Sequence, residues 1–210
     1  QYYEMLFVYV DDILALSHQA TMSIQEITTF FKAKDGSIKP PEIYLGADIV
    51  KMQLPDGREV WSTSPRTYVK NSILVVERLL EEDGDGYVLK TNARNPFPTG
   101  YKPEIDITDE LDQTMATRFM QLIGILRWAV EIGRIDIYLE TSLLSQYQAN
   151  PRFGHLEAAY HIFAYLKKHQ DMGRLAFDSN PPNIDESFFY TNAVLTDFYG
   201  DVTEELLPNM

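Results

Sequence analysis

The sequence predicts an α+β fold in which two β-hairpins near the N-terminus precede a mainly helical region. Apolar runs at residues 5–10 and 13–16 flank two adjacent aspartates, which indicates a first hairpin. The stretches "EIYLGADIVKMQL" and "REVWSTS" lie on either side of the turn "PDG" and indicate a second. Beyond residue 108, apolar residues recur at helical spacing in three successive stretches.

The composition is that of a folded chain with an acidic surplus. The 210 residues are 45% hydrophobic and 12% aromatic, enough for a packed core. No apolar run reaches the roughly 18–20 residues that span a bilayer, so we expect no membrane partner. The chain has no cysteine, which excludes disulfides and thiolate metal sites. The net charge of −13 argues against a general nucleic-acid binder, whose affinity comes from Lys and Arg.

Two helices are predicted within the first 83 residues. In "SIQEITTFFKA", Ser23 is the expected N-cap and Glu26, three residues later, completes a capping box. In "SPRTYVKNSILVVERLLEED", Ser64 is the expected N-cap and Pro65 occupies the first helical position. The apolar residues of this second helix recur at helical spacing: Val69, Ile73, Val76 and Leu80.

The remaining chain is predicted from its breaks and its apolar stripes. Residues 84–108, rich in glycine and proline, are expected to be a boundary or a long crossover. A helix is predicted over 109–131, ended by Gly133, followed by helices in "RIDIYLETSLLSQYQA" and "HLEAAYHIFAYLKKHQ". "GRLAFD" is predicted to be a short strand. The acidic residues 179–210 have no assigned structure.

Asp11 and Asp12 are the candidate catalytic and metal-ligating residues. Adjacent carboxylates repel each other unless a cation neutralises them. Mg²⁺ suits such a pair, since it binds a few carboxylates together with substrate phosphate oxygens. Aspartate is also common in exposed turns for its backbone geometry alone. Here, however, both flanking strands are apolar, and the aromatic Tyr9 lies two positions before the first aspartate.

The segment "YVDDIL" resembles the YxDD hairpin of reverse transcriptases, and the rest of the chain is similar to the copia-type (Pseudoviridae) retrotransposon polymerases. "YLGADI" resembles the family's FLGxEI strand, and "STSPRTYV" its SQxxYI segment. "LIGILRWAVEIGRIDI" resembles LIGSLLYLAxxTRPDI, and "LLSQYQANPRFGHLEAAYHIFAYLK" resembles LSRFxxxPxxxHxxAAKRILRYLK. These segments occur in the family's order and cover residues 2–177.

The resemblance implies RNA-directed DNA synthesis, in which dNTPs are added to a primer 3′-OH with two Mg²⁺ ions, or Mn²⁺ in their place. It implies that Asp11 is a metal ligand and that Asp12 is a second, less tightly engaged one. Tyr9 and Val10 would lie beside the primer end. Leu45 and Gly46 would belong to the hairpin that grips the primer of the RNA/DNA template–primer duplex.

The resemblance also implies a domain plan. Residues 1–63 would be the C-terminal part of a polymerase palm, with the YVDD hairpin and a primer-grip-like hairpin, and 64–107 a thumb-entry helix and linker. Residues 108–178 would form a helical thumb and connection, and 179–210 an acidic tail leading toward a ribonuclease H region. The implied location is cytoplasmic, in virus-like particles, with access to the nucleus left open.

We expect the chain to be an excerpt of a longer Pol polyprotein and to be inactive in isolation. The family's other essential palm aspartate and its fingers region would precede Gln1, and the ribonuclease H region would follow. The acidic "TDFYGD" lacks the pattern expected for that region, so Asp197 and Asp201 are not predicted as site residues.

Several positions depart from the family pattern. Ile135 stands where the family has proline, although Arg134 and Asp136 match. Tyr160, His161 and Ala164 stand where the family has basic residues, which predicts weaker nucleic-acid contact by that helix. His155 is expected to pack against or cap the start of the helix.

Two other functions stay open. One is a decayed or repurposed remnant that acts as a non-catalytic protein-interaction module, favoured by the acidic balance and the lost basic residues. The other is an unrelated metal-dependent hydrolase, for which the sequence offers no additional cluster of carboxylates or histidines.

Overall fold

The computed structural model describes residues 5–17, 19–83, 88–90 and 92–177, together with two short strands further on. The fold is α+β, as predicted. The chain divides into two compact units, Gln1–Phe177 and Asp178–Met210. In the second unit, β7 (Val194–Leu195) pairs antiparallel with β8 (Val202–Thr203). Asp197 and Asp201 lie outside the described residues.

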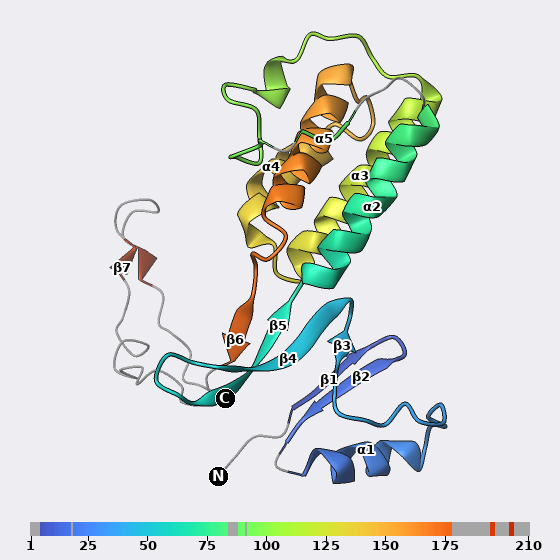
Figure 1. Ribbon diagram of the computed structural model, residues 1–210, viewed down its shortest axis with the longest axis vertical. Helices are drawn as coiled ribbons and strands as arrows, with labels where there is room; N and C mark the ends of the chain where they lie inside the picture. The colour runs from blue at the N-terminus through green and yellow to red at the C-terminus, as the bar shows by residue number, and fades with distance from the viewer. Residues whose placement is uncertain are drawn as a thin grey trace. The chain divides into compact units, whose positions relative to one another are not determined.

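The first hairpin consists of β1 (Met5–Tyr9) and β2 (Asp12–Leu16) (Figure 1). Tyr9 pairs with Asp12, so the two turn residues are Val10 and Asp11. The sequence had placed both aspartates in the turn, and this is wrong for Asp12, which is the first residue of β2.

Helix α1 (Ala20–Thr28) follows this hairpin and begins earlier than predicted. Its N-cap is Gln19, which makes no side-chain cap, and Ser23 lies inside the helix. The predicted capping box at Ser23 and Glu26 is therefore wrong. The reason is that the three residues before Ser23 contain no helix breaker and add almost one more turn.

The second sheet has the strand order β3-β4-β5-β6 and is antiparallel throughout. The sequence predicted "EIYLGADIVKMQL" as one strand, but the chain reverses at Leu45–Gly46. Both turn residues have positive φ, 52° and 85°, which is what a tight two-residue hairpin requires. The four strands are β3 (Ile43–Tyr44), β4 (Ala47–Gln53), β5 (Glu59–Ser64) and β6 (Leu175–Phe177).

Strand β5 leads directly into α2 (Arg66–Asp83), and the predicted start of this helix is confirmed. The Ser64 hydroxyl oxygen accepts a hydrogen bond from the Arg66 N–H at 3.3 Å, with Pro65 between them. The predicted apolar stripe faces the core. All four of its residues are buried: Val69, Ile73, Val76 and Leu80.

Helix α3 (Gln113–Glu131) begins four residues later than predicted, because the Asp112 side chain accepts from the Met115 N–H at 2.8 Å and acts as the N-cap. The predicted break at Gly133 is confirmed, since the helix ends before it and its φ is 128°. The other helical elements are the 3-10 turns η1 (Pro103–Ile105) and η2 (Ile135–Ile137) and the helices α4 (Tyr138–Ser145) and α5 (Phe153–Lys168).

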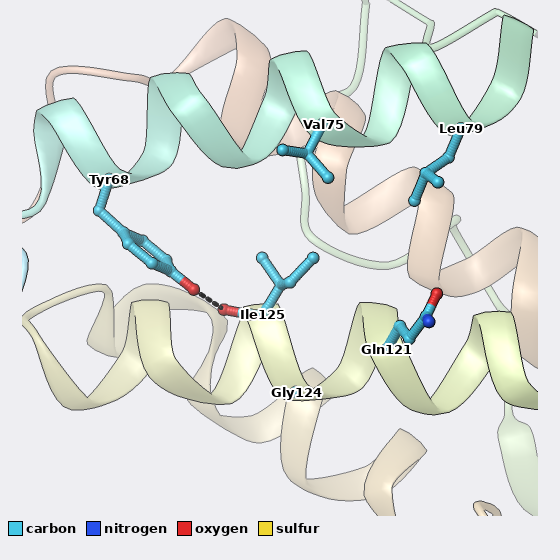
Figure 2. A pocket seen from close by; sticks show the side chains of 6 residues that line it. All are labelled: Tyr68, Val75, Leu79, Gln121, Gly124 and Ile125. Carbon is cyan, nitrogen blue, oxygen red and sulfur yellow. Dashed lines mark hydrogen bonds between the residues drawn. The ribbon is translucent and has the colours of Figure 1, made fainter.

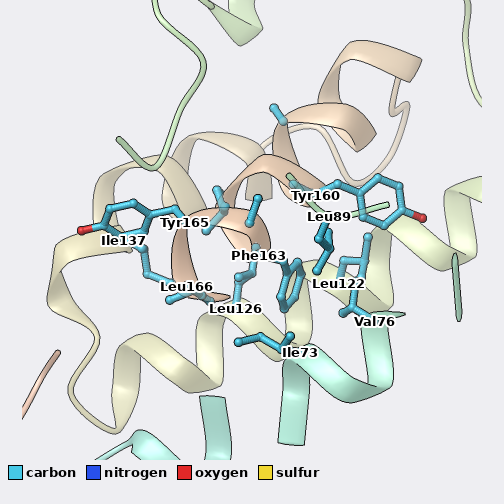
Figure 3. Packing of buried hydrophobic residues seen from close by; sticks show 14 of the residues in the cluster. Ile73, Val76, Leu89, Leu122, Leu126, Ile137, Tyr160, Phe163, Tyr165 and Leu166 are labelled. Atoms are coloured by element: carbon cyan, nitrogen blue, oxygen red, sulfur yellow. The ribbon is translucent and has the colours of Figure 1, made fainter. Parts of the chain in front are cut away.

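Helices α2 to α5 gather around one apolar core (Figures 1 and 3). Phe163 of α5 packs near the middle of the cluster, with Ile73 of α2 and Leu122 and Leu126 of α3 around it (Figure 3). Within the residues that the structure describes, each helix is too short or too polar to span a lipid bilayer. The second sheet is joined to this bundle where β5 leads into α2 and where β6 follows α5.

Candidate functional site

The YVDD hairpin presents its turn to solvent. Asp11 and Asp12 are both exposed, and Val10 at the tip is 87% exposed. Val10 also has a φ of 53°, a conformation that is an outlier for a β-branched residue. Backbone strain of this kind persists only where the surroundings impose it, and it concentrates at functional sites.

Tyr9 and Asp12 leave the hairpin on the same face, because they are directly paired across the two strands. The Tyr9 ring lies 6.1 Å from the Trp128 ring of α3, centroid to centroid, at an angle of 52°. Asp12 is also close enough to Tyr44 of β3 for its charge to affect the ionisation of the Tyr44 hydroxyl. Burial, and then the negative charge of Asp12, raise the pKa of the Tyr44 hydroxyl.

The Leu45–Gly46 turn lies against the same indole. The Trp128 Nε1–H donates a hydrogen bond to the Leu45 carbonyl oxygen at 3.2 Å. A Cβ added at Gly46 would lie 3.5 Å from Trp128 Nε1 and 3.6 Å from the Tyr68 ring, so the turn backbone fits closely between two aromatic side chains. Glycine is required here mainly for its positive φ.

Tyr68 of α2 fixes the other side of this turn to the bundle. Its hydroxyl donates to the Ile125 carbonyl oxygen at 3.1 Å, as Figure 2 shows. Burial raises the pKa of this hydroxyl. The ring stands at one end of a shallow apolar groove between α2 and α3, which is lined by Tyr68, Val75, Leu79, Gln121, Gly124 and Ile125.

A further bond ties the second sheet to the start of α2. The Asp48 carboxylate on β4 accepts from the Thr67 N–H in the first turn of the helix, at 3.1 Å. A carboxylate is favourable at this end of a helix because the first N–H groups have no partner within the helix. The Leu45–Gly46 turn is therefore held to the bundle by two aromatic residues and one helix cap.

The predicted site residues thus fall into two groups. Tyr9, Leu45 and Gly46 lie beside Trp128, and Asp12 lies near Tyr44. Val10 and Asp11 form the turn of the hairpin. The sequence reasoning missed Trp128. The sequence offered only a tryptophan within a predicted helix, and nothing in it indicates which distant acceptor its N–H would bind.

The residues present suit a hard cation only in part. Asp11 and Asp12 supply carboxylate oxygens, which Mg²⁺ prefers, and both are accessible to solvent. Across the described ranges, no group of three or more His, Asp or Glu side chains is arranged to hold a metal ion. The pair therefore fits a Mg²⁺ ion that takes its other ligands from water, substrate phosphates or further carboxylates.

The positions matching the family's TRPDI segment form an internal ion pair. Arg134 is fully buried and its guanidinium binds the Asp136 carboxylate through two hydrogen bonds, of 2.9 and 2.8 Å. Burial by itself works to raise the pKa of Asp136, but the hydrogen bond and charge of Arg134 outweigh it and lower that pKa. Arg134 and Asp136, the two positions that agree with the family segment, thus have a structural role in this chain.

The substituted positions of α5 contact other parts of the chain. Tyr160 and Ala164 are buried in the core, and His161 makes a contact with the Asn95 carbonyl oxygen at 3.1 Å. Tyr160 and Ala164 thus lie on the inward side of the helix, and the weaker nucleic-acid contact expected of α5 stays a prediction. Lys167 is engaged as well, with Glu77 of α2 at 2.6 Å.

His155 lies at the start of α5, and its predicted role there is confirmed. It is buried, its Nδ1 accepts from the Arg152 N–H at 3.1 Å, and its ring stacks on Tyr147 at 4.2 Å. Since Nδ1 is an acceptor, Nε2 carries the proton and donates to the Pro103 carbonyl oxygen at 3.1 Å.

The chain has no match among models of protein families, curated proteins or solved structures.

Proposed function

We propose that this chain is part of an RNA-directed DNA polymerase of the copia retrotransposon type, and that it supplies the YVDD hairpin and the turn that grips the primer. One observation carries the proposal. The hairpin and the Leu45–Gly46 turn, more than 30 residues apart in sequence, both contact the indole of Trp128. Two segments that each resemble a motif of the same family thus share one neighbouring side chain, and this supports the proposal.

In the proposed reaction, Asp11 in the turn and Asp12 at the start of β2 would hold Mg²⁺. Two bound Mg²⁺ ions would activate the primer 3′-oxygen and neutralise the leaving pyrophosphate. The exposed Val10 and the Tyr9 ring lie next to the carboxylates and would contact the end of the primer. The backbone of Leu45 and Gly46, held rigid by Trp128 and Tyr68, would orient the primer strand.

The exposed surface of the hairpin supports the expectation that this chain works only with further polypeptide. Met5, Phe7 and Val8 of β1 are 53%, 44% and 59% exposed, and Phe30 and Phe31 beyond α1 are 80% and 71% exposed. A two-stranded hairpin is marginally stable alone, and large exposed apolar patches mark interaction sites. We propose that the remainder of a polymerase covers this surface.

The same observation favours a second candidate function. If the polymerase parent has decayed, the apolar hairpin is a surface for binding another protein, and the net charge of −13 suits a partner other than nucleic acid. The two functions differ in what they require of the aspartates. A protein-binding surface tolerates amide replacements at Asp11 and Asp12, whereas a metal site does not.

Primer extension tests the proposal. A longer polypeptide that includes the chain should extend an RNA-templated primer with dNTPs and Mg²⁺, and the 210 residues alone should not. Asp11→Asn should abolish extension, and Asp12→Asn should reduce it by at least about a hundredfold, which is the scale expected when electrostatic stabilisation of the reacting charge is lost.

Asp35→Asn is the matched control, since Asp35 lies in an exposed turn outside the YVDD segment, and it should leave extension unchanged. Extension by the 210 residues alone would contradict the incompleteness of the site. Full activity of Asp11→Asn would contradict the metal assignment.

A further inference from the structure

Trp128 is the side chain that both turns of the candidate site touch. Its ring faces Tyr9 of the YVDD hairpin, and its N–H binds the carbonyl oxygen of Leu45. We infer that Trp128 is a positioning residue, which sets the spacing between the hairpin that carries the aspartates and the turn that grips the primer. It acts through Tyr9 and Leu45, without touching the reacting atoms.

The hairpin has few close backbone neighbours outside itself, which makes this ring contact important for holding it. Within the described chain, the main backbone contacts of β1 and β2 are with each other and, for β2, with α1. The outer residues of both strands are largely exposed. The Tyr9–Trp128 ring contact therefore ties an otherwise loosely held hairpin to the helical bundle.

Trp128 is itself rigidly held. Its neighbours Leu126 and Ala129 on α3 have 0% and 1% exposure, so the helix that carries it is fixed in the core. The Leu45–Gly46 turn is fixed to the same base by Tyr68 and by the bond from Thr67 to Asp48. The indole is therefore a fixed point between one firmly attached turn and one weakly attached hairpin.

The consequence for catalysis rests on the proposed function. A transferring group must lie within a few tenths of an ångström of its reactive position, and a displacement of about 1 Å can lower the rate about a hundredfold. If the hairpin holds the metal ions and the turn holds the primer, their spacing decides whether the 3′-oxygen meets them correctly.

A distance measurement on the 210-residue chain tests the inference without any assay of activity. The chain has no cysteine, so Met5→Cys on β1 and Val50→Cys on β4, both at exposed positions, give a unique pair of spin-labelling sites. Double electron–electron resonance should give one narrow distance distribution. Trp128→Ala should broaden it about twofold as the hairpin begins to move independently.

Three further variants separate this role from a general loss of stability. Tyr9→Ala removes the other partner of the ring contact without altering the bundle, and should broaden the distribution as Trp128→Ala does. Tyr9→Phe retains the ring and should not broaden it. Trp61→Phe is the matched tryptophan control, because Trp61 lies on β5 and its ring contacts Lys51. An unchanged distribution in both Trp128→Ala and Tyr9→Ala would overturn the inference.

Steady-state kinetics distinguish a positioning role of Trp128 from direct contact between Trp128 and the primer–template duplex. In a polypeptide that extends primers, Trp128→Phe should lower kcat about tenfold and leave the KM for primer–template nearly unchanged. A raised KM with unchanged kcat would mean that Trp128 binds the duplex directly, and would overturn the positioning role. If the unsubstituted polypeptide extends no primer, the proposed function fails, while the distance measurement still decides the role of Trp128.

Discussion

Arg134 forms a bidentate ion pair with Asp136: Nε–H donates to Oδ1 at 2.9 Å and Nη2–H donates to Oδ2 at 2.8 Å. The arginine side chain has no exposed surface, while that of the aspartate keeps 22%. The guanidinium also lies over the ring of Tyr165, 5.9 Å from its centroid. The pair thereby fastens the end of α3 and the turn η2 to the last helix of the bundle.

Removing the carboxylate from this pair should be strongly destabilising. Asp136→Ala leaves the charge of Arg134 buried without its partner, and we expect a loss of about 3 kcal/mol in the free energy of unfolding, measured in urea. Glu59→Gln is the comparison, because it breaks the exposed Lys51–Glu59 pair and should cost less than about 1 kcal/mol. Equal losses in the two variants would contradict the structural role of the buried pair.

The same carboxylate should make stability depend on pH. Burial opposes its ionisation, but Arg134 lowers the pKa of Asp136 below the ordinary value of 3.8. A group with a lowered pKa in the folded state stabilises the fold fully above its unfolded pKa, and loses this contribution as pH falls through the folded pKa. The difference in unfolding free energy between the unsubstituted chain and Asp136→Asn should therefore narrow below about pH 4. If this difference in unfolding free energy stayed constant down to about pH 2, the lowered pKa of Asp136 would be contradicted.

Gly154 should not tolerate a side chain. A Cβ at this position would overlap the Asp106 carboxylate, which cannot move away without losing its bonds from Tyr101 Oη at 2.7 Å and Thr108 Oγ1 at 2.6 Å. We expect Gly154→Ala to cost about 2 kcal/mol in thermal or urea unfolding. Gly124→Ala is the control: its Cβ would meet nothing within 4 Å, and the variant should gain about 0.5–1 kcal/mol.

A second comparison isolates the cause of that loss. In an Asp106→Ala background the overlap is absent, so Gly154→Ala should lose most of its cost. If the cost persists, the carboxylate is not what excludes the side chain.

Val10→Gly should stabilise the YVDD hairpin. The φ of 53° strains a β-branched residue, and the 87% exposed side chain contributes little packing that glycine would lose. Relief of strain should exceed the entropy cost of glycine, giving a net gain of about 1 kcal/mol in the opening free energy of β1–β2 amides by hydrogen exchange. Val8→Gly, within the strand, should instead lower it. A loss in Val10→Gly would show that the turn is unstrained.

The spacing of apolar residues predicted the helices of the bundle well, because each helix buries one apolar face in the core. The sequence predicts the apolar stripe from Val69 to Leu80, which is buried. It also predicts the start of α2, because serine is a favoured N-cap and proline a favoured first helical residue, as at Ser64 and Pro65. Local rules also explain the errors. Ser23 and Glu26 match a capping box, yet nothing before them stops the helix from beginning earlier.

The site was less predictable, because its arrangement depends on contacts distant in sequence. The motifs named Asp11, Asp12, Leu45 and Gly46, but the reversal at Leu45 requires a leucine with positive φ, which residue preferences oppose. Trp128 could not be identified either. Its importance arises from an acceptor 83 residues away, and no local pattern records that pairing.

The exposed hairpin has a consequence for handling the protein. Each strand of β1–β2 has only one neighbour among the described residues, so each offers a free row of backbone groups beside apolar side chains. Such edges are templates for aggregation between copies. The net charge of −13 opposes this by mutual repulsion, which salt weakens because it screens exposed charges. Dilute, low-salt solutions therefore suit this chain, whereas high salt favours its self-association.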